Sequence, residues 1–244
     1  MFRSKKTNAP LPAPTGTGPA VSLSKVPPGL VSLTKTAAVS LEKSGLTGQR
    51  AAVYLVLDHS GSMYPYYEDG SVQRLAEQAL GLSANLDDDG IVPIVYFGSD
   101  AEAPDPIDLD GYAGVIDRTH AAVFWGSTDY AAAMRAVIAD YQAGLQSTPA
   151  LVIFQTDGVP DSKADAADVL REASLLPIFW AFVGFGQSIS FLEKLDDLRG
   201  RRVDNASFFH AADPHSVTDA ELYDGITHEY AAWLAAASGA GIVR

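Results

Sequence analysis

The sequence predicts an α/β protein with a doubly wound, mostly parallel sheet and helices on both faces, in a three-layer sandwich. From residue 51 onward, short apolar runs alternate with stretches of helical character, which is typical of parallel strands joined by covering helices. Two of the apolar runs end directly in an aspartate, Asp58 and Asp157. The composition, 47% apolar and 19% charged, is that of a globular chain that can build a core.

The individual elements follow from the pattern of apolar residues. Apolar runs predict strands over residues 51–57, 91–97, 150–156 and 177–184, and a weaker run predicts a strand near 207–211. Helical stretches are predicted over residues 72–85, 129–143, 163–173, 191–198 and 218–237. In such a sheet, ligands bind at the carboxyl ends of the strands, near a change in strand order.

The first 50 residues differ in composition from the rest. Residues 1–20 are rich in Pro, Gly, Thr and Ala, which predicts a disordered leader. The pattern Val-x-Leu-x-Lys occurs at 21–25, 31–35 and 39–43, and its alternation predicts short β-strands, either at an edge of the body or in a separate docking segment. We therefore expect a leader over 1–20, a β-rich segment over 21–49 and a main domain over 50–240.

Charge and composition restrict the classes of function. The net charge is −13, although the first 50 residues are basic, with seven Lys and Arg against one Glu. The acidic main domain is expected to bind no nucleic acid, because phosphates repel it. No apolar run approaches the roughly 20 residues of a membrane helix, and no secretory signal is recognisable, so we expect a cytoplasmic protein without a membrane span. Without cysteine there are no disulfides or thiolate metal sites.

The strongest functional signal follows the first predicted strand. Asp58, Ser60 and Ser62 stand at positions i, i+2 and i+4 of one short loop, so three oxygen donors can face the same point. Carboxylate and hydroxyl oxygens favour Mg²⁺, Mn²⁺ or Ca²⁺ over Zn²⁺ or Cu²⁺. Asp157 ends a second strand, and Thr128 precedes a predicted helix and can lend a further hydroxyl. The sequence therefore predicts a divalent-cation site built from three loops.

This set of residues resembles the metal-ion-dependent adhesion site (MIDAS) of von Willebrand factor A (vWA) domains, whose signature is Asp-x-Ser-x-Ser with a distant Thr and a distant Asp. The resemblance covers roughly residues 50–238. It implies that Asp58, Ser60, Ser62 and Thr128 hold the ion directly or through water, and that Asp157 often acts through a water. It also implies an open coordination position that an Asp or Glu of a partner protein fills. Mg²⁺ is the first expectation, with Mn²⁺ or Ca²⁺ as alternatives.

A narrower resemblance is to the vWA proteins of bacterial tellurium and toxic-cation resistance, the TerF-like group. It is carried by the segments at 67–74, 86–90, 182–184, 204–209 and 221–224. The Val-Ser-Leu-x-Lys repeats resemble the opening of the TerD family. The resemblance implies a role in a resistance or stress-response system. One departure is Ser127, where a glycine is expected beside Thr128.

We expect a binding module rather than an enzyme, because the chain has no Gly-x-Ser-x-Gly elbow, no Walker A motif and no HExxH motif. Two alternatives remain. The first is a metal-dependent hydrolase or phosphoryl-transfer enzyme, in which His59 is the only obvious base beside the cluster. The second is a cation sensor.

Four further features have ordinary structural interpretations. His59 is expected to face solvent beside the site, and the run Asp87-Asp88-Asp89 to be a solvated loop. The tyrosines at 64, 66 and 67 either form a contact surface or shield the metal loop. The arginines at 199, 201 and 202 are expected to pair with the aspartates at 196, 197 and 204.

Overall fold

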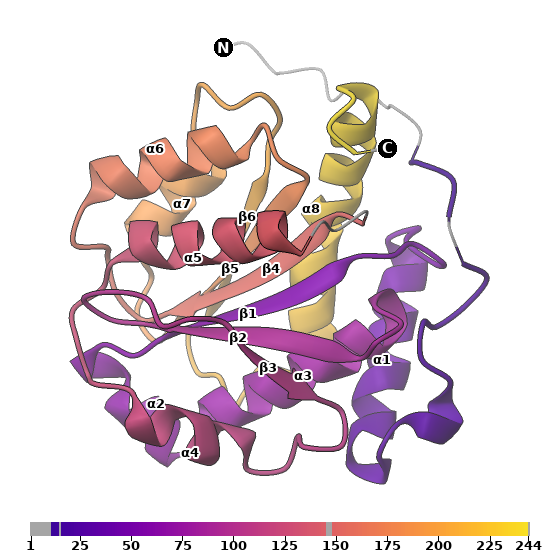
Figure 1. Ribbon diagram of the computed structural model, residues 1–244, viewed down its shortest axis with the longest axis horizontal. Helices are drawn as coiled ribbons and strands as arrows, with labels where there is room; N and C mark the ends of the chain where they lie inside the picture. The colour runs from indigo at the N-terminus through magenta and orange to yellow at the C-terminus, as the bar shows by residue number, and fades with distance from the viewer. Residues whose placement is uncertain (1–10, 15, 145–147, 244) are drawn as a thin grey trace.

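The computed structural model describes residues 11–14, 16–144 and 148–243, and a six-stranded sheet forms the middle layer (Figure 1). The strands are β1 (Ala52–Asp58), β2 (Ile91–Phe97), β3 (Asp105–Asp108), β4 (Ala150–Thr156), β5 (Ile178–Phe185) and β6 (Ala206–Ala211). They lie in the order β3-β2-β1-β4-β5-β6, and all neighbours are parallel except β2 and β3. β1, β4 and β5 are buried along their whole length, as expected of central parallel strands with both faces covered.

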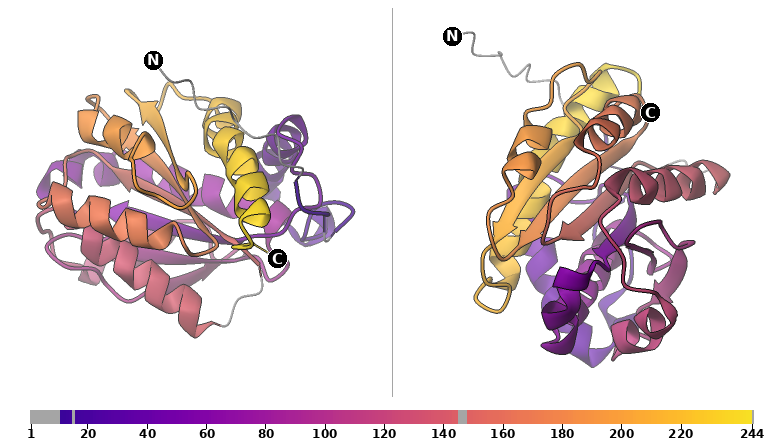
Figure 2. Two further views of the ribbon diagram at one scale, coloured as in Figure 1. Left: turned by 90° about the horizontal axis from the view of Figure 1, so that it is seen from above. Right: turned by 90° about the vertical axis from the view of Figure 1, so that its left-hand side faces the viewer.

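Helices cover both faces of the sheet (Figures 1 and 2). One face carries α1 (Val31–Lys43), α3 (Ser71–Leu86) and α8 (Asp219–Gly239), and the other carries α5 (Tyr130–Ala143), α6 (Lys163–Ala173) and α7 (Ser190–Asp196). Successive side chains of β1 alternate between the two cores, as strand geometry requires. The connections hold α2 (Tyr64–Glu68), α4 (Val115–Thr119) and the 3₁₀ turns η1 (Leu23–Lys25), η2 (Pro28–Leu30), η3 (Gly61–Met63) and η4 (His120–Ala122). Among the described helices, none has both the length and the apolar character needed to cross a membrane.

The predicted fold class is confirmed. All five predicted strands and all five predicted helices of the main domain are present, with ends within two residues of the predicted ones. The sequence did not reveal β3, which pairs antiparallel at the edge of the sheet. Three of its four residues are exposed and one is Pro106, so it lacks the apolar run by which the other strands were recognised.

The prediction of β-strands in residues 21–49 is wrong, because this segment forms η1, η2 and the long helix α1. The residues that α1 buries are Thr34, Ala37, Ser40 and Leu41, and the spacing of three or four between Thr34, Ala37 and Leu41 places them on one face of the helix. α1 packs against α3 and α8. Gly81 of α3 permits the close approach, since a Cβ there would come within 2.7 Å of the Leu33 Cβ.

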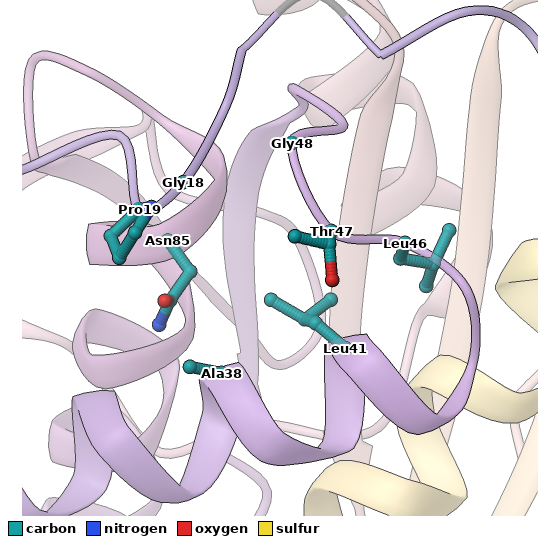
Figure 3. A pocket seen from close by; sticks show the side chains of 8 residues that line it. All are labelled: Gly18, Pro19, Ala38, Leu41, Leu46, Thr47, Gly48 and Asn85. Carbon is teal, nitrogen blue, oxygen red and sulfur yellow. The ribbon is translucent and has the colours of Figure 1, made fainter.

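The leader was predicted to be disordered over residues 1–20, and residues 1–10 and 15 lie outside the described part. The remainder follows the body in an extended course held by hydrogen bonds. Gly16 N donates to Gly48 O (2.9 Å), and Ala20 N donates to Asn85 O (3.2 Å). Figure 3 shows the Asn85 side chain between this segment and α1, beside a small cavity of about 50 Å³. The described end of the leader is therefore part of the folded body.

Candidate metal centre

Asp58 and Asp157 lie at the same edge of the sheet, at the ends of two adjacent strands. Asp58 is the last residue of β1, and Asp157 follows the last residue of β4, to which β1 pairs in parallel. From β1 the chain continues to β2 on one side, and β4 begins the other half of the sheet. The two aspartates therefore stand at the switch in strand order where open α/β sheets bind ligands.

The Asp58 carboxylate is fully buried. Its Oδ1 accepts a hydrogen bond from Ser60 N (2.8 Å), and its Oδ2 accepts one from Thr156 Oγ1 (2.5 Å). Burial raises the pKa of Asp58 to about 6, against the lowering effect of these hydrogen bonds, and the nearby Asp157 adds to the rise. In the part of the chain that the structure describes, no basic side chain forms an ion pair with Asp58. A buried carboxylate without a counter-ion is costly, so the site is suited to a cation.

Ser60 and Ser62 connect the two aspartates. The Ser60 and Ser62 hydroxyl oxygens lie 3.3 Å apart, and Ser62 Oγ donates to Asp157 Oδ1 (2.8 Å). Burial raises the pKa of Asp157, and the hydrogen bond from Ser62 opposes that rise. The structure thus brings four of the five predicted ligands, Asp58, Ser60, Ser62 and Asp157, into one hydrogen-bonded group.

The loop that carries Thr128 is joined to the loop that carries Ser60 and Ser62. Gly126 N donates to His59 O (3.1 Å), and Gly61 N donates to Gly126 O (3.3 Å), so the two loops are joined by backbone hydrogen bonds. A Cβ on Gly126 would lie 2.5 Å from Ser99 N, and this close approach requires glycine. Among the described contacts, the Thr128 hydroxyl makes no hydrogen bond to the other four residues, so its role as a ligand stays a prediction.

Asp161, which the sequence pattern did not reveal, holds the Thr128 loop. Asp161 Oδ2 accepts from Ser127 Oγ (2.6 Å) and from Thr128 N (3.1 Å), and Asp161 N donates to Thr128 O (3.0 Å). Ser127 N donates to Ser99 Oγ, and the two hydroxyl oxygens lie 3.0 Å apart. Ser127 therefore bridges two neighbouring loops, which gives the departure from glycine a structural role. The only signal for Asp161 in the sequence is its place four residues after Asp157.

The donors fit a hard divalent cation. Among the described residues, no group of three or more His, Cys, Asp and Glu side chains is arranged to hold a metal ion. A cation at this point would therefore depend on serine and threonine hydroxyls as well as on the two carboxylates, a set suited to Mg²⁺, Mn²⁺ or Ca²⁺. Such an ion would also offset the repulsion between Asp58 and Asp157.

The expectation that His59 faces solvent is wrong. His59 is fully buried, and its ring stacks on Trp125 with centroids 3.7 Å apart. Its Nε2 lies 3.2 Å from His120 Nδ1, and its Nδ1 lies 3.4 Å from Phe124 O. Burial lowers the pKa of His59 to about 4. The side chain following Asp58 thus anchors the metal loop to the loop that carries Phe124 and Trp125.

Exposed apolar side chains surround the cluster. Phe124 is 89% exposed, Tyr64 51%, Val159 50% and Trp125 39%. Phe124, Trp125 and Val159 belong to loops that carry predicted ligands, Tyr64 begins α2 directly after the Ser60–Ser62 loop, and the Tyr64 and Trp125 rings lie 5.6 Å apart. We call these four residues the apolar rim. Single exposed apolar residues are ordinary, whereas a contiguous group of them is typical of an interaction surface.

The other two tyrosines of the predicted aromatic group have internal roles. Tyr67 is buried, and its hydroxyl donates to Asp58 O (3.0 Å). Tyr66 packs on Phe185, with ring centroids 5.3 Å apart. Tyr67 therefore supports the metal loop, and of the three tyrosines Tyr64 is the exposed one, for which a role in a contact surface stays a prediction.

Comparison with known proteins agrees with this geometry. Residues 50–243 match the family model described as the vWA found in the TerF C terminus. The uncharacterized protein YcbR of Bacillus subtilis is 34% identical over 216 residues, covering 86% of this chain and 88% of YcbR.

Two similar solved structures have the same fold. The von Willebrand factor type A protein from Catenulispora acidiphila aligns with a TM-score of 0.56 and 19% identity, over 75% of this chain and 43% of that one. Proximal thread matrix protein 1 from the mussel byssus, whose MIDAS motif is occupied by zinc, aligns with a TM-score of 0.54 and 15% identity, over 74% of this chain and 48% of that one. The present chain thus matches less than half of either structure. The family model covers most of the chain and includes both strand ends of the site, so the protein belongs to the family of vWA domains found at the TerF C terminus.

Proposed function

We propose that the protein is a divalent-cation-dependent protein-binding module. In this proposal Asp58, Ser60, Ser62, Thr128 and Asp157 hold the ion, and a carboxylate of a partner protein completes its coordination. The observation that carries the proposal is the fully buried Asp58 carboxylate, which no basic side chain neutralises among the described residues. Mg²⁺ is the proposed ion, because every proposed donor is a hard oxygen.

The surroundings of the site favour a macromolecular ligand. The apolar rim offers contact area beside the predicted ligands, and aromatic residues are enriched in protein interfaces. The occupied MIDAS motif of the mussel protein gives an example, on the same fold, of metal at the corresponding motif.

We propose that the module is not an enzyme. His59 was the one obvious base beside the cluster, and its buried ring stacks on Trp125 with both nitrogens near other protein atoms. A general base must reach a substrate proton, and this position does not favour such contact. Metal-dependent phosphatase and nucleotide-hydrolysis assays test this proposal, and turnover that Asp58→Ala abolishes would contradict it.

Metal-gated binding can be tested by affinity capture from a lysate of the native host. Wild type, Asp58→Ala and the matched control Asp88→Ala are each used in millimolar Mg²⁺ and in EDTA, and captured proteins are identified by mass spectrometry. Asp88 is exposed and precedes β2, at the opposite end of the sheet from Asp58. We expect a partner with wild type and Asp88→Ala in Mg²⁺ only. Identical protein sets in all samples would contradict the mechanism.

We further propose a role in a bacterial tellurium or toxic-cation resistance or stress-response system. The support is the TerF relationship of the family model. A deletion strain of the native host should grow less well on tellurite, and wild type should restore growth where Asp58→Ala does not. If both wild type and Asp58→Ala restored growth, any role in resistance would not depend on the metal site. The cytoplasmic location and the lack of nucleic-acid binding stay predictions from the sequence.

A further inference from the structure

A cavity of about 180 Å³ lies beside the metal site. It is formed where the chain leaves β2 and where the loop before α5 passes that strand end. Its lining includes Tyr96, Asp100, Glu102, Val123, Phe124 and Trp125. Gly98, Ser99 and Gly126 complete it, and the last two also fix the loop that carries Thr128.

Two chemical properties are combined in this cavity. Part of its lining is aromatic and aliphatic, with the Trp125 ring fixed by its stacking on His59. The lining also includes the acidic residues Asp100 and Glu102, both of which are exposed. No Lys or Arg is among the residues that line the cavity, so these two charges have no basic partner within its lining.

We propose that this cavity binds the Arg or Lys side chain of a partner polypeptide. An aliphatic stem can lie along Val123 and Phe124, while the cationic head meets the two carboxylates and the Trp125 face. A purely apolar side chain would remove water from Asp100 and Glu102 without replacing it, which is unfavourable. An anion would be repelled by the same two residues.

Recognition of one partner at both the cavity and the metal site rests on the proposed function. Ser99 and Gly126 line the cavity and also hold the loop that carries Thr128. One segment of a partner can therefore contact both the cavity and the metal site. A partner would then be recognised at two points, an Asp or Glu at the ion and a basic residue in the cavity. The cavity itself does not depend on the ion, and the two parts can therefore be tested separately.

The first test uses N-acetyl-arginine amide as the probe, in EDTA, with the full chain. Binding is followed by ¹⁵N–¹H NMR and by tryptophan fluorescence. Trp125 is the exposed indole among three, since Trp180 and Trp233 are 0% and 2% exposed. We expect saturable shifts at the residues lining the cavity and a change in Trp125 emission, with the same affinity in Mg²⁺. N-acetyl-norleucine amide, which lacks the charge, should bind at least several-fold more weakly.

The variant for this test is Asp100→Asn with Glu102→Gln, which keeps side-chain shape and removes two charges. We expect the affinity for the arginine probe to fall about fivefold to tenfold, because each exposed charge pair contributes modestly. The matched control, Asp165→Asn with Asp168→Asn on α6, changes the net charge equally and should bind as wild type does. The proposal would be overturned if the two probes bound equally well or if the two double variants had equal affinity for the arginine probe. It would also be overturned if the probe caused no shifts at the residues that line the cavity. An Asp58→Ala chain that binds the arginine probe normally would leave it standing even if metal-gated binding failed.

Discussion

At the scale of single residues, Asp58 decides the electrostatics of the site. Its carboxylate is held in a fully buried position by hydrogen bonds from Ser60 and Thr156, without a basic neighbour among the described residues. Without a cation, its ionised form lowers the stability of the fold, since burial of a charge is unfavourable. When a cation is bound, the buried Asp58 carboxylate attracts it strongly, because little water screens the two charges.

We therefore predict opposite effects of Asp58→Asn in the two conditions at pH 7. In EDTA the variant should be as stable as wild type or more stable. At a Mg²⁺ concentration of about 100 times the dissociation constant, wild type should gain about 2.7 kcal/mol of unfolding free energy, and the variant should gain little. Urea unfolding followed by circular dichroism measures both, with Asp88→Asn as the control. An equal Mg²⁺-dependent gain in wild type and Asp58→Asn would place the ion elsewhere.

Asp161 and Ser127 fix the backbone of the loop that carries Thr128. We predict that Asp161→Ala weakens Mg²⁺ binding by about tenfold or more, as removal of groups that orient metal ligands commonly does. Ser127→Gly should have a smaller effect in the same direction, because Asp161 keeps its bond to Thr128 N. Isothermal titration with Mg²⁺ checks both values against Asp168→Ala, an exposed change on α6. Unchanged affinity in Asp161→Ala would show that this loop does not orient a ligand.

At the scale of elements, the sequence revealed the parallel strands and their helices because these carry continuous or periodic apolar runs. It also revealed the chelating loop, since Asp58, Ser60 and Ser62 lie within five residues. It failed at α1, where the buried face is built partly from Thr34 and Ser40. The remaining Val and Leu alternate with other residues, and that alternation is typical of a strand.

The local sequence pattern also did not indicate that His59 is buried or that Asp161 holds the Thr128 loop. Their environments are set by residues distant in the sequence, His120 and Trp125 for His59 and Ser127 for Asp161. A local pattern contains no information on such contacts, and an isolated polar residue in a loop is most often solvated. The predicted ligands of the first loop could thus be recognised from their spacing in the sequence. The residues that support them could be recognised only in the folded structure.

Asp196, at the end of α7, makes the stability of the fold depend on pH. Burial raises the pKa of Asp196 to about 7, with contributions from Glu229, Asp204 and Asp197, while Arg201 opposes the rise. The predicted arginine–aspartate pairing is present for Arg201 and Asp204, at 2.7 Å, and the Arg201 side chain is only 5% exposed. The folded state thus holds the Asp196 proton more tightly than the unfolded chain does.

From this difference we predict that the stability contributed by protonated Asp196 is complete below about pH 4 and is lost as the pH rises to about 7. Asp196→Asn should therefore be more stable than wild type at pH 8 and nearly equal to it at pH 4. Urea unfolding at pH 4, 6 and 8 gives the difference between the two chains, and Asp168→Asn serves as the exposed control. A difference that does not change with pH would exclude this titration.

At the scale of the whole molecule, the boundary of the vWA match at residue 50 is not a boundary of the core. Leu30, Ala37, Leu41 and Leu46 are at most 4% exposed and belong to the same core as β1, α3 and α8. α1 lies against α3 and α8 on the face that carries these helices (Figures 1 and 2). Residues 21–49 therefore complete one layer of the sandwich instead of forming a separate segment.

This arrangement predicts that a fragment of residues 50–244 is much less stable than the full chain. Removal of three buried leucines and their neighbours sacrifices about 5 kcal/mol or more of apolar burial, a large part of the stability of an ordinary domain. The fragment should unfold at lower urea concentration and bind the dye ANS, because α3 and α8 lose their cover. The comparison is a chain beginning at residue 11, which retains the contacts of Gly16 and Ala20 with the body. Equal urea midpoints for the two fragments would mean that the layer formed by α1 is dispensable, and that the vWA match alone delimits the folding unit.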